Sequence, residues 1–318
     1  MTNALLEMPG LPAFSRIKPD MVEAAIDTLL QENRETMERL LNTIPNPTWK
    51  TFIEPLEIAE DRLSRAWSPV SHMNSVVNSE PLREVYNACL PKLSEYATEV
   101  GQNSQLCDAY KQVAEQADLD SAQRKMLENA LLEFRLSGVD LAEEKKQRYK
   151  EITQTLSKLT TKFEENLLDA TNAWSKLITD PEQLAGLPES AMALAKQTAE
   201  QREQQGWLLT LEFPSYFPVM TYADQRELRR EAYEAYSTRA SDSGPHAGEW
   251  DNTEVMDQIL ELRHEQAQLL GFDNYAERSL ARKMARRTDE VVAFLTDLAR
   301  RSRPQAEAEL TQLTQFAK

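Results

Sequence analysis

Glycine is scarce in this chain, and that scarcity constrains the fold more than any other feature of the sequence. Only 8 of the 318 residues are glycine. Glycine supplies the positive backbone φ angles that tight β-turns and phosphate-cradling loops require. Its scarcity therefore disfavours a β-barrel, a β-sandwich or a Rossmann domain and favours an all-α protein.

The apolar residues recur at the three- and four-residue spacing of amphipathic helices. The clearest case runs from about 142 to 177, where Tyr149, Ile152 and Leu156 begin an apolar stripe. Such a stripe usually packs into a core and only rarely lines a cofactor. Helices are predicted over 19–41, 48–67, 79–101, 105–117, 120–138, 142–177, 190–203, 224–240, 253–270, 273–284 and from 288 onward. Thr48 and Ser79 are predicted to cap the helices that they begin, and Asp120 with Gln123 resembles a capping box.

One segment departs from the helical pattern. Trp207–Phe213 is apolar and partly aromatic, and Gly206 and Pro214 bound it. This pattern indicates a strand, and Pro218–Tyr222 is a candidate second extended piece. We therefore expect an all-α, bundle-like lobe with one small β-hairpin or edge near 207–222.

Prolines and a glycine interrupt the helical pattern and suggest that the chain has three parts. The helical pattern of 1–180 loosens around Pro181, Gly186 and Pro188. We therefore predict a helical lobe over 1–180, a connecting segment over 181–206 and the start of a second helical region over 207–318. The last helix is still amphipathic at Lys318, with no stop signal after Leu313, so we expect the sequence to be a fragment.

The net charge and the cysteines limit the binding partners and the cellular compartments that we expect for this chain. With 36 basic and 52 acidic side chains, the formal net charge is −16, which disfavours binding to nucleic acids and to anionic membrane surfaces. No stretch approaches the ~20 apolar residues that cross a bilayer. Cys89 and Cys107 lie in helical patterns, so we expect them to be reduced and buried. A cytoplasmic location is expected, because the first 14 residues do not resemble a signal peptide.

A zinc-protease helix needs two histidines four residues apart, so that both imidazoles leave the same face. The chain has three histidines, His72, His246 and His264, at separations of 174 and 18 residues. His264-Glu265 begins such a motif, but Gln268 stands where the second histidine is required. Glutamine is a poor zinc ligand. We therefore predict no metal, cofactor or catalytic residue in this chain.

The sequence gives only weak indications of a catalytic or substrate-binding site that does not use a metal. Ser71 and His72 are sequence neighbours, which does not by itself make a nucleophile–base pair. Residues 241–252 form the most polar and glycine-dense loop, which is either an exposed turn or a loop that contacts substrate. A metal-independent hydrolase using Ser71 or His246 has little support beyond residue type.

Several sequence blocks nevertheless resemble one family. They lie in order along essentially the whole chain, and the densest is near Ala267–Phe272. The blocks are Ser68–Ser75, Leu82–Tyr86, Arg148–Ile152, Asn166–Ala170, Pro218–Tyr222, Leu228, Arg229, Tyr233, Tyr236, Thr238–Ala240, Leu262, Arg263, Ala267–Phe272, Asn274–Ala276, Ser279, Leu280 and Lys283–Ala285. Their order and spacing are similar to those of bacterial members of the thimet oligopeptidase (M3) family of zinc metallopeptidases.

The resemblance implies an all-α fold with a deep channel that admits short peptides. It also implies one zinc ion, held by a His-Glu-x-x-His helix and a downstream glutamate, whose glutamate activates a metal-bound water. None of these zinc-binding or catalytic residues has a counterpart in this chain. The resemblance places His264-Glu265 in a block that precedes the zinc helix of the family. The chain would thus supply part of a channel wall, with short peptides and a C-terminal catalytic region as partners.

Two interpretations of the function therefore remain. In the first, the chain is an inactive portion of a zinc oligopeptidase, and its exposed last helix makes it prone to self-association. In the second, it is a stand-alone helical module that binds peptides or acts as a scaffold without catalysis.

Overall fold

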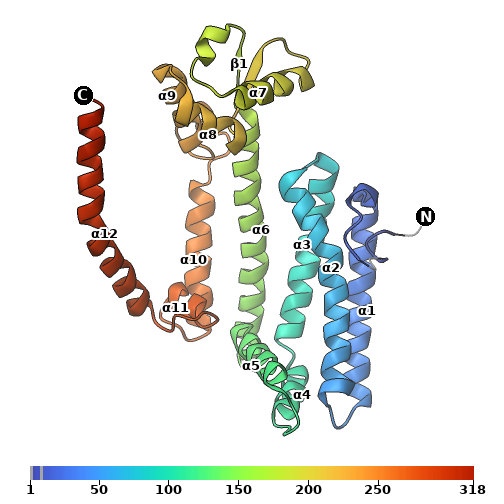
Figure 1. Ribbon diagram of the computed structural model, residues 1–318. Helices are drawn as coiled ribbons and strands as arrows, with labels where there is room; N and C mark the ends of the chain where they lie inside the picture. Colours follow the sequence, from blue (N-terminus) through green and yellow to red (C-terminus); the bar gives the residue numbers. More distant parts are fainter. Residues whose placement is uncertain (1–2, 8–9) are drawn as a thin grey trace. The chain divides into compact units, whose positions relative to one another are not determined.

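The computed structural model describes residues 3–7 and 10–318 (Figure 1). The all-α prediction is confirmed, because the described residues contain only one small sheet, of two strands. The chain divides into two compact units, Met1–Thr155 with Leu262–Lys318, and Leu156–Glu261. Helices α6 (Glu143–Ala173) and α10 (Thr253–Leu269) contribute to both units. Within the described residues, no helix is long and apolar enough to cross a membrane.

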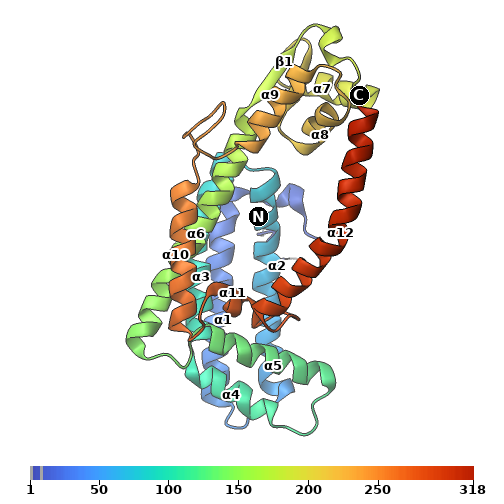
Figure 2. The same ribbon diagram turned by 90° about the vertical axis from the view of Figure 1, so that its left-hand side faces the viewer.

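The first unit begins with a bundle of helices. Helix α1 packs on α2 and α3, which also pack on each other, and α4 packs on α5. Figures 1 and 2 both place α4 and α5 at one end of the three longer helices. The bounds are α1 Val22–Thr43, α2 Glu54–Val76, α3 Glu80–Gly101, α4 Ser104–Ala114 and α5 Ser121–Leu136.

Two apolar clusters hold this bundle together, and both come from the faces that the helical spacing predicts. Helix α1 supplies Ile26 and Leu29 to one cluster and Met37 and Leu40 to the other. Each of these side chains is at most 5% exposed. Burying such a side chain contributes about 1.5–3 kcal/mol. The predicted burial of Cys89 and Cys107 is also confirmed, and both are free thiols.

Two of the three predicted side-chain caps form, whereas Ser79 makes no side-chain hydrogen bond at the start of α3. Thr48 accepts from the backbone N–H of Thr51, in a five-residue π-helical turn (Trp49–Ile53) that leads into α2. Asp120 and Gln123 form the predicted capping box of α5. Helices α3 and α12 continue through Pro91 and Pro304.

The second unit contains the sheet, and here one expectation is wrong. Strand β2 (Trp207–Thr210) lies where a strand is predicted, but it pairs antiparallel with β1 (Ser175–Ile178), in the register Ile178↔Trp207. The segment expected to be extended, Pro218–Tyr222, is part of helix α8 (Phe213–Tyr222). Pro214 lies in the first turn of α8, where the missing N–H costs nothing.

Helices surround this small sheet. Helix α7 (Glu189–Gln201) packs on β2 and on α8, and α8 packs on α9 (Arg226–Ser237). The short 3-10 turn Pro181–Leu184 follows β1. Helix α6 ends at Ala173, earlier than the predicted 177, because the next residues pair in the sheet. The strand interior is apolar, with Leu208 and Leu209 at most 3% exposed.

The last helices of the first unit are much more exposed. Helix α11 (Tyr275–Leu280) is shorter than the predicted 273–284, and Asn274 caps it. Helix α12 (Thr288–Phe316) begins at the predicted residue but has no buried residue. Phe294, Leu295 and Leu298 are 52–67% exposed, so their apolar stripe has no cover within the described residues.

Candidate functional site

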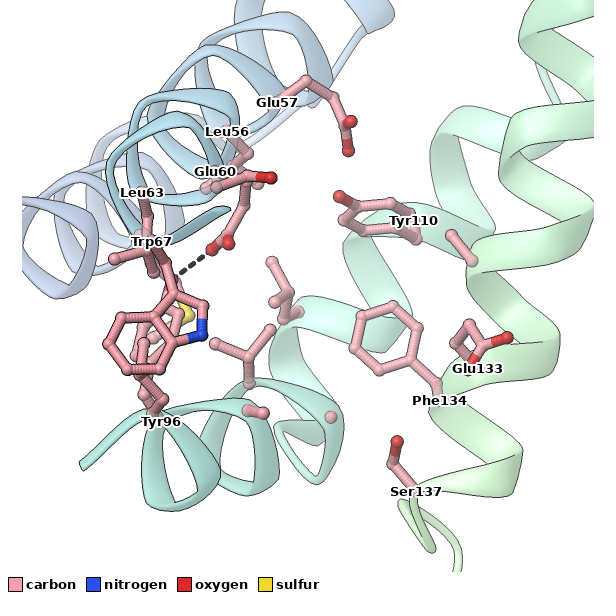
Figure 3. A pocket seen from close by; sticks show the side chains of 18 residues that line it. Leu56, Glu57, Glu60, Leu63, Trp67, Tyr96, Tyr110, Glu133, Phe134 and Ser137 are labelled. Atoms are coloured by element: carbon pink, nitrogen blue, oxygen red, sulfur yellow. Dashed lines mark hydrogen bonds between the residues drawn. The ribbon is translucent and has the colours of Figure 1, made fainter. Parts of the chain in front are cut away.

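The first unit contains a pocket of about 520 Å³, open to solvent, between α2, α3, α4 and α5 (Figure 3). Most of its lining is apolar, but carboxylates and two tyrosines interrupt it. We call it the Tyr110 pocket. Its lining comprises Met37, Leu56, Glu57, Glu60, Leu63, Ser64, Trp67, Leu93, Tyr96, Ala97, Val100, Gly101, Leu106, Tyr110, Ala130, Glu133, Phe134 and Ser137.

Helical periodicity explains how distant residues meet in this pocket. On α2, Leu56, Glu60, Leu63 and Trp67 follow one another at four-, three- and four-residue intervals, which places them on one face. Helix α3 contributes Tyr96 and its neighbours in the same way. Carboxylates of α2 therefore share a face with core residues.

Helices α4 and α5 form the opposite wall. Asn103 caps α4 by accepting from the backbone N–H of Leu106 at 2.9 Å, and Tyr110 follows about two turns later. The Tyr110 ring meets Phe134 of α5 edge-on, with ring centroids 5.3 Å apart. Gly101 brings α3 against the end of α5, because a Cβ there would lie 2.6 Å from the Cβ of Ser137. Gly101 and Ser137 both line the pocket where α3 and α5 approach each other.

Some polar side chains of the pocket have a hydrogen-bond partner in the protein, and others do not. The Tyr96 hydroxyl donates to the Glu60 carboxylate, the interaction drawn as a dashed line in Figure 3. Tyr110 is 7% exposed, and its hydroxyl faces the side of the pocket where Glu57 lies. Among residues 3–7 and 10–318, no hydrogen bond to this hydroxyl is formed. Glu57 likewise has no hydrogen-bond or ion-pair partner in the described chain.

Burial and neighbouring charges raise the pKa of one carboxylate and of both tyrosines in the pocket. Burial raises the pKa of Glu57 above its ordinary 4.5, and the neighbouring charge of Glu60 raises it further. Burial also raises the pKa of Tyr110, and the charges of Glu57 and Glu60 add to it. The pKa of Tyr96 rises through burial and through its bond to Glu60. Both phenols are therefore neutral at physiological pH, and the pocket carries negative charge.

Cations lie near the pocket but not in its lining. Arg282 pairs with Glu133 at 2.5 Å. Arg34 lies over the Tyr96 ring, 5.4 Å from its centre, and pairs with Glu99 at 2.8 Å. The lining itself has three carboxylates and, among the described residues, no lysine, arginine or histidine. Chemically, the pocket can hold an apolar group and a positive charge.

The side chains of the incomplete zinc motif form hydrogen bonds and an ion pair with other residues of the chain. Glu265 accepts two hydrogen bonds from the Arg148 guanidinium, at 2.6 and 2.7 Å, and this bond holds the pKa of Glu265 below its usual range. Gln268 donates to the Asp273 carbonyl at 2.8 Å. No cluster of three metal-ligating side chains occurs among the described residues. The ion pair between Glu265 and Arg148 thus joins α10 to α6 within the first unit.

The nucleophile candidates do not form a catalytic pair. The His72 ring lies 6.0 Å from the Phe14 ring, and His246 Nδ1 lies 3.1 Å from a Glu249 carboxylate oxygen. In the described part of the chain, no serine hydroxyl is bonded to either imidazole. Ser71 therefore has no general base in this structure.

The loop 241–252 is anchored at its end. The side chain of Asn252 is 2% exposed and joins the loop to α6, accepting from Asn166 Nδ2 at 2.8 Å and donating to the Phe163 carbonyl at 3.1 Å. The backbone N–H of Gly248 donates to the Ser241 carbonyl at 3.0 Å. The middle of the loop is largely exposed, and its contact with substrate stays a prediction.

Sequence reasoning missed the Tyr110 pocket. A signal was present, because Glu57 and Glu60 lie beside apolar positions of a strongly periodic helix. The sequence alone does not reveal that Tyr96 and Tyr110, on two other helices, would face them.

Two family profiles match the chain. Residues 26–146 match the profile described as "Neurolysin/Thimet oligopeptidase, N-terminal domain". Residues 219–318 match that of "Peptidase family M3". The first match covers all residues of the Tyr110 pocket, and the second covers the incomplete zinc motif.

Curated relatives align along almost all of the chain. Oligopeptidase A of Haemophilus influenzae is 54% identical over 316 residues, which cover 98% of this chain and 46% of the relative. Oligopeptidase A of Escherichia coli K12 is 54% identical over 321 residues, covering 100% and 47%. Dipeptidyl carboxypeptidase of Salmonella typhimurium is 28% identical over 302 residues, covering 92% and 44%. The chain thus spans about half the length of the curated relatives it matches.

Proposed function

Because this chain belongs to peptidase family M3, we propose that it is the N-terminal portion of a zinc-dependent oligopeptidase that hydrolyses short peptides. The observation that carries the proposal is the 54% identity with oligopeptidase A along the whole chain. Since the matched stretch is less than half of those relatives, the activity, substrates and partners of the whole protein are all part of the proposal.

Zinc is the cofactor that we propose for the longer protein, and the described residues do not fit a site for it. Glu265 is held by Arg148, and Gln268 replaces the second histidine of the motif. No other group of three ligating side chains compensates in the described chain. We therefore derive no catalytic step from these residues, and we expect this chain to bind no zinc and to be inactive on its own.

The role that we assign to this chain is positional. Its helices would form part of the wall of a substrate channel, and such a wall limits the size of the peptide that can enter. Two buried clusters in α1–α5 support this role, because a wall that selects by size must resist deformation. The division into 1–180, 181–206 and 207–318 remains a proposal for the layout of the longer protein.

The partners and location follow the same proposal. The C-terminal catalytic region would be the natural partner of this chain, and copies of the chain would associate through the exposed α12 stripe. The net charge of −16 argues against nucleic acids and anionic lipid surfaces. The two free, buried thiols fit a reducing compartment such as the cytoplasm.

Zinc content and peptide hydrolysis test the proposal together. Purified 1–318 is measured by elemental analysis and with a quenched fluorescent peptide, next to a longer protein that extends to the length of its relatives. We expect zinc and chelator-sensitive hydrolysis only in the longer protein. Hydrolysis by purified 1–318 that a chelator abolishes would overturn the inactivity of this chain. A longer protein without zinc or activity would overturn the enzyme assignment.

A stand-alone binding module is the second candidate, and the Tyr110 pocket is the observation that favours it. All residues that line this pocket lie within one unit. Binding of peptides to 1–318 at micromolar concentrations without turnover, together with an inactive longer protein, would favour this second function.

A further inference from the structure

We propose that the Tyr110 pocket binds a hydrophobic amine, a small organic cation whose apolar body fills the cavity and whose ammonium group lies between Glu57 and Tyr110. The inference goes beyond the peptidase assignment and does not depend on it, because it rests on the pocket alone. Three features of the pocket define the ligand, namely its apolar walls, an unpartnered hydroxyl that is accessible from the pocket and its unbalanced negative charge.

The walls fit a compact apolar or aromatic body. A volume of about 520 Å³ falls in the range of small-molecule sites. Trp67, Tyr96 and Phe134 present rings to this space (Figure 3). Trp67 is itself held by stacking on Tyr86, with ring centroids 4.8 Å apart. Aromatic faces also attract cations, so these walls favour a charged amine over a neutral compound of the same shape.

The Tyr110 hydroxyl marks where the polar end of the ligand lies. Tyr110 is more than nine-tenths buried, and no residue in the described ranges bonds its hydroxyl. The hydroxyl oxygen itself is accessible from the pocket, so it is free to accept a hydrogen bond from a bound ligand. An ammonium group has three donors and no acceptor. One of them satisfies the phenolic oxygen of Tyr110.

The charge of the pocket selects a cation over an anion. Of its three carboxylates, Glu133 is balanced by Arg282 and Glu60 accepts from Tyr96. Glu57 has no partner among the described residues and lies beside the like charge of Glu60. Desolvation in the pocket raises the pKa of Glu57, and the charge of Glu60 raises it further. An ammonium group next to Glu57 offsets this repulsion and donates a charge-assisted hydrogen bond to the carboxylate. A carboxylate ligand would add a further negative charge.

Three probes of one shape test the proposal with the chain as it is. The probes are 4-phenylbutylamine, 4-phenylbutanol and 4-phenylbutyrate, which are cationic, neutral and anionic at neutral pH. Binding to 1–318 is measured by isothermal titration calorimetry and by saturation-transfer NMR. We expect the amine to bind about tenfold more tightly than the alcohol, as a charge-assisted hydrogen bond predicts, and the acid to bind more weakly than either.

Two variants locate the binding. Glu57→Gln changes a side chain exposed enough to keep the fold, and it should remove the preference for the amine while the alcohol still binds. Ala97→Trp places a large ring at an exposed position of the lining and should abolish binding of all three probes. Glu54→Gln is the matched control, an exposed carboxylate on the same helix outside the lining, and should change nothing.

Several results would overturn the proposal. Equal affinity for the amine and the alcohol would refute the role of the carboxylates. Amine binding that survives in the folded Ala97→Trp protein would place the site elsewhere. Absence of binding by wild-type 1–318 at millimolar probe would refute the site itself. Each of these outcomes leaves the zinc and hydrolysis experiment unaffected.

Discussion

Helices α1–α5 and helix α12 carry the same kind of amphipathic pattern but differ in what covers it. Leu29 of α1 and Leu127 of α5 are at most 1% exposed. Leu295, Leu298 and Leu310 of α12 are 52–65% exposed. The periodicity of a sequence shows that a helix has an apolar face, but it does not show whether the described chain contains a partner for that face.

The comparison also separates two uses of an apolar helix face. In α2, the apolar face includes Glu57 and Glu60 and borders a pocket. In α12, the stripe is flanked by exposed ion pairs such as Arg303–Glu307 at 2.8 Å. A carboxylate that lies beside a like charge at the edge of a pocket is a candidate for a functional role. Exposed pairs within one helix contribute little and suggest only solubility.

The largest expected difference between the two regions is in the response to truncation of a leucine. Leu40→Ala should lower the free energy of unfolding by ~2–5 kcal/mol, because Leu40 is 1% exposed in a closely packed cluster. Leu298→Ala in α12 should change it by less than about 0.5 kcal/mol. Urea unfolding monitored by circular dichroism measures both. Similar losses in the two variants would mean that α12 is covered in solution.

The second prediction concerns association through α12. If copies of the chain associate through the stripe, Leu295→Glu with Leu298→Glu should weaken association by about tenfold or more, since charge is then placed in an apolar contact. Ala293→Glu with Thr296→Glu is the matched control, because these exposed residues lie on the other side of the helix. Sedimentation velocity over a range of concentrations measures the effect. A wild-type chain that is monomeric at high concentration would contradict self-association.

The third prediction compares the capping residues of α5 and α12, whose replacement should change stability less than the leucine truncation does. The Asp120 side chain accepts from the backbone N–H of Gln123 at 2.8 Å at the start of α5. The residue before α12, Arg287, provides no such bond. Asp120→Ala should therefore destabilise the first unit by ~1 kcal/mol, whereas Arg287→Ala should have a smaller effect. Hydrogen exchange at the two helix starts distinguishes local fraying from global unfolding, and equal effects of the two changes would refute the capping argument.

The smallest expected effect is a gain in stability with a characteristic pH dependence. The folded-state pKa of Glu57 lies above its unfolded value, so ionisation of Glu57 opposes folding as pH rises through the folded pKa. Because Glu57 is exposed and solvent screens its charge, Glu57→Gln should stabilise the chain only slightly at neutral pH, and the gain should vanish below the unfolded pKa. Glu60, Tyr96, Tyr110 and Glu133 face the same pocket and are unchanged in the variant.

Thermal unfolding from about pH 4 to pH 8 measures this effect, with Glu54→Gln as control. A gain that is independent of pH would show that Glu57 is not electrostatically strained, and the argument for a cation beside it would lose its support.

Much of the fold was predictable from local signals. The capping box at Asp120 and the start of α12 at Thr288 both follow from the sequence, because caps and periodicity depend on neighbouring residues. The error at Pro218–Tyr222 arose because apolar, β-branched residues fit a strand or a buried helix equally well. The strand that completes the sheet, Ser175–Ile178, was concealed in the pattern of the preceding helix.

The candidate site was less predictable than the fold. The separations of His72, His246 and His264 were enough to exclude a zinc helix of the expected spacing. The Tyr110 pocket, in contrast, depends on four helices meeting, and its strongest evidence is a hydroxyl that lacks a partner among the described residues. Whether a hydroxyl is paired depends on every neighbour in space, and the order of residues along the chain does not specify those neighbours.

The sequence by itself determined the all-α class, most helix boundaries and the resemblance to a peptidase family, because composition, capping and local periodicity act over a few residues. Only the tertiary structure decided that Glu265 binds Arg148, that Glu57 faces a pocket and that the face of α12 lies open. These are properties of long-range packing, in which residues far apart in the chain set the burial, charge and hydrogen bonding of one another.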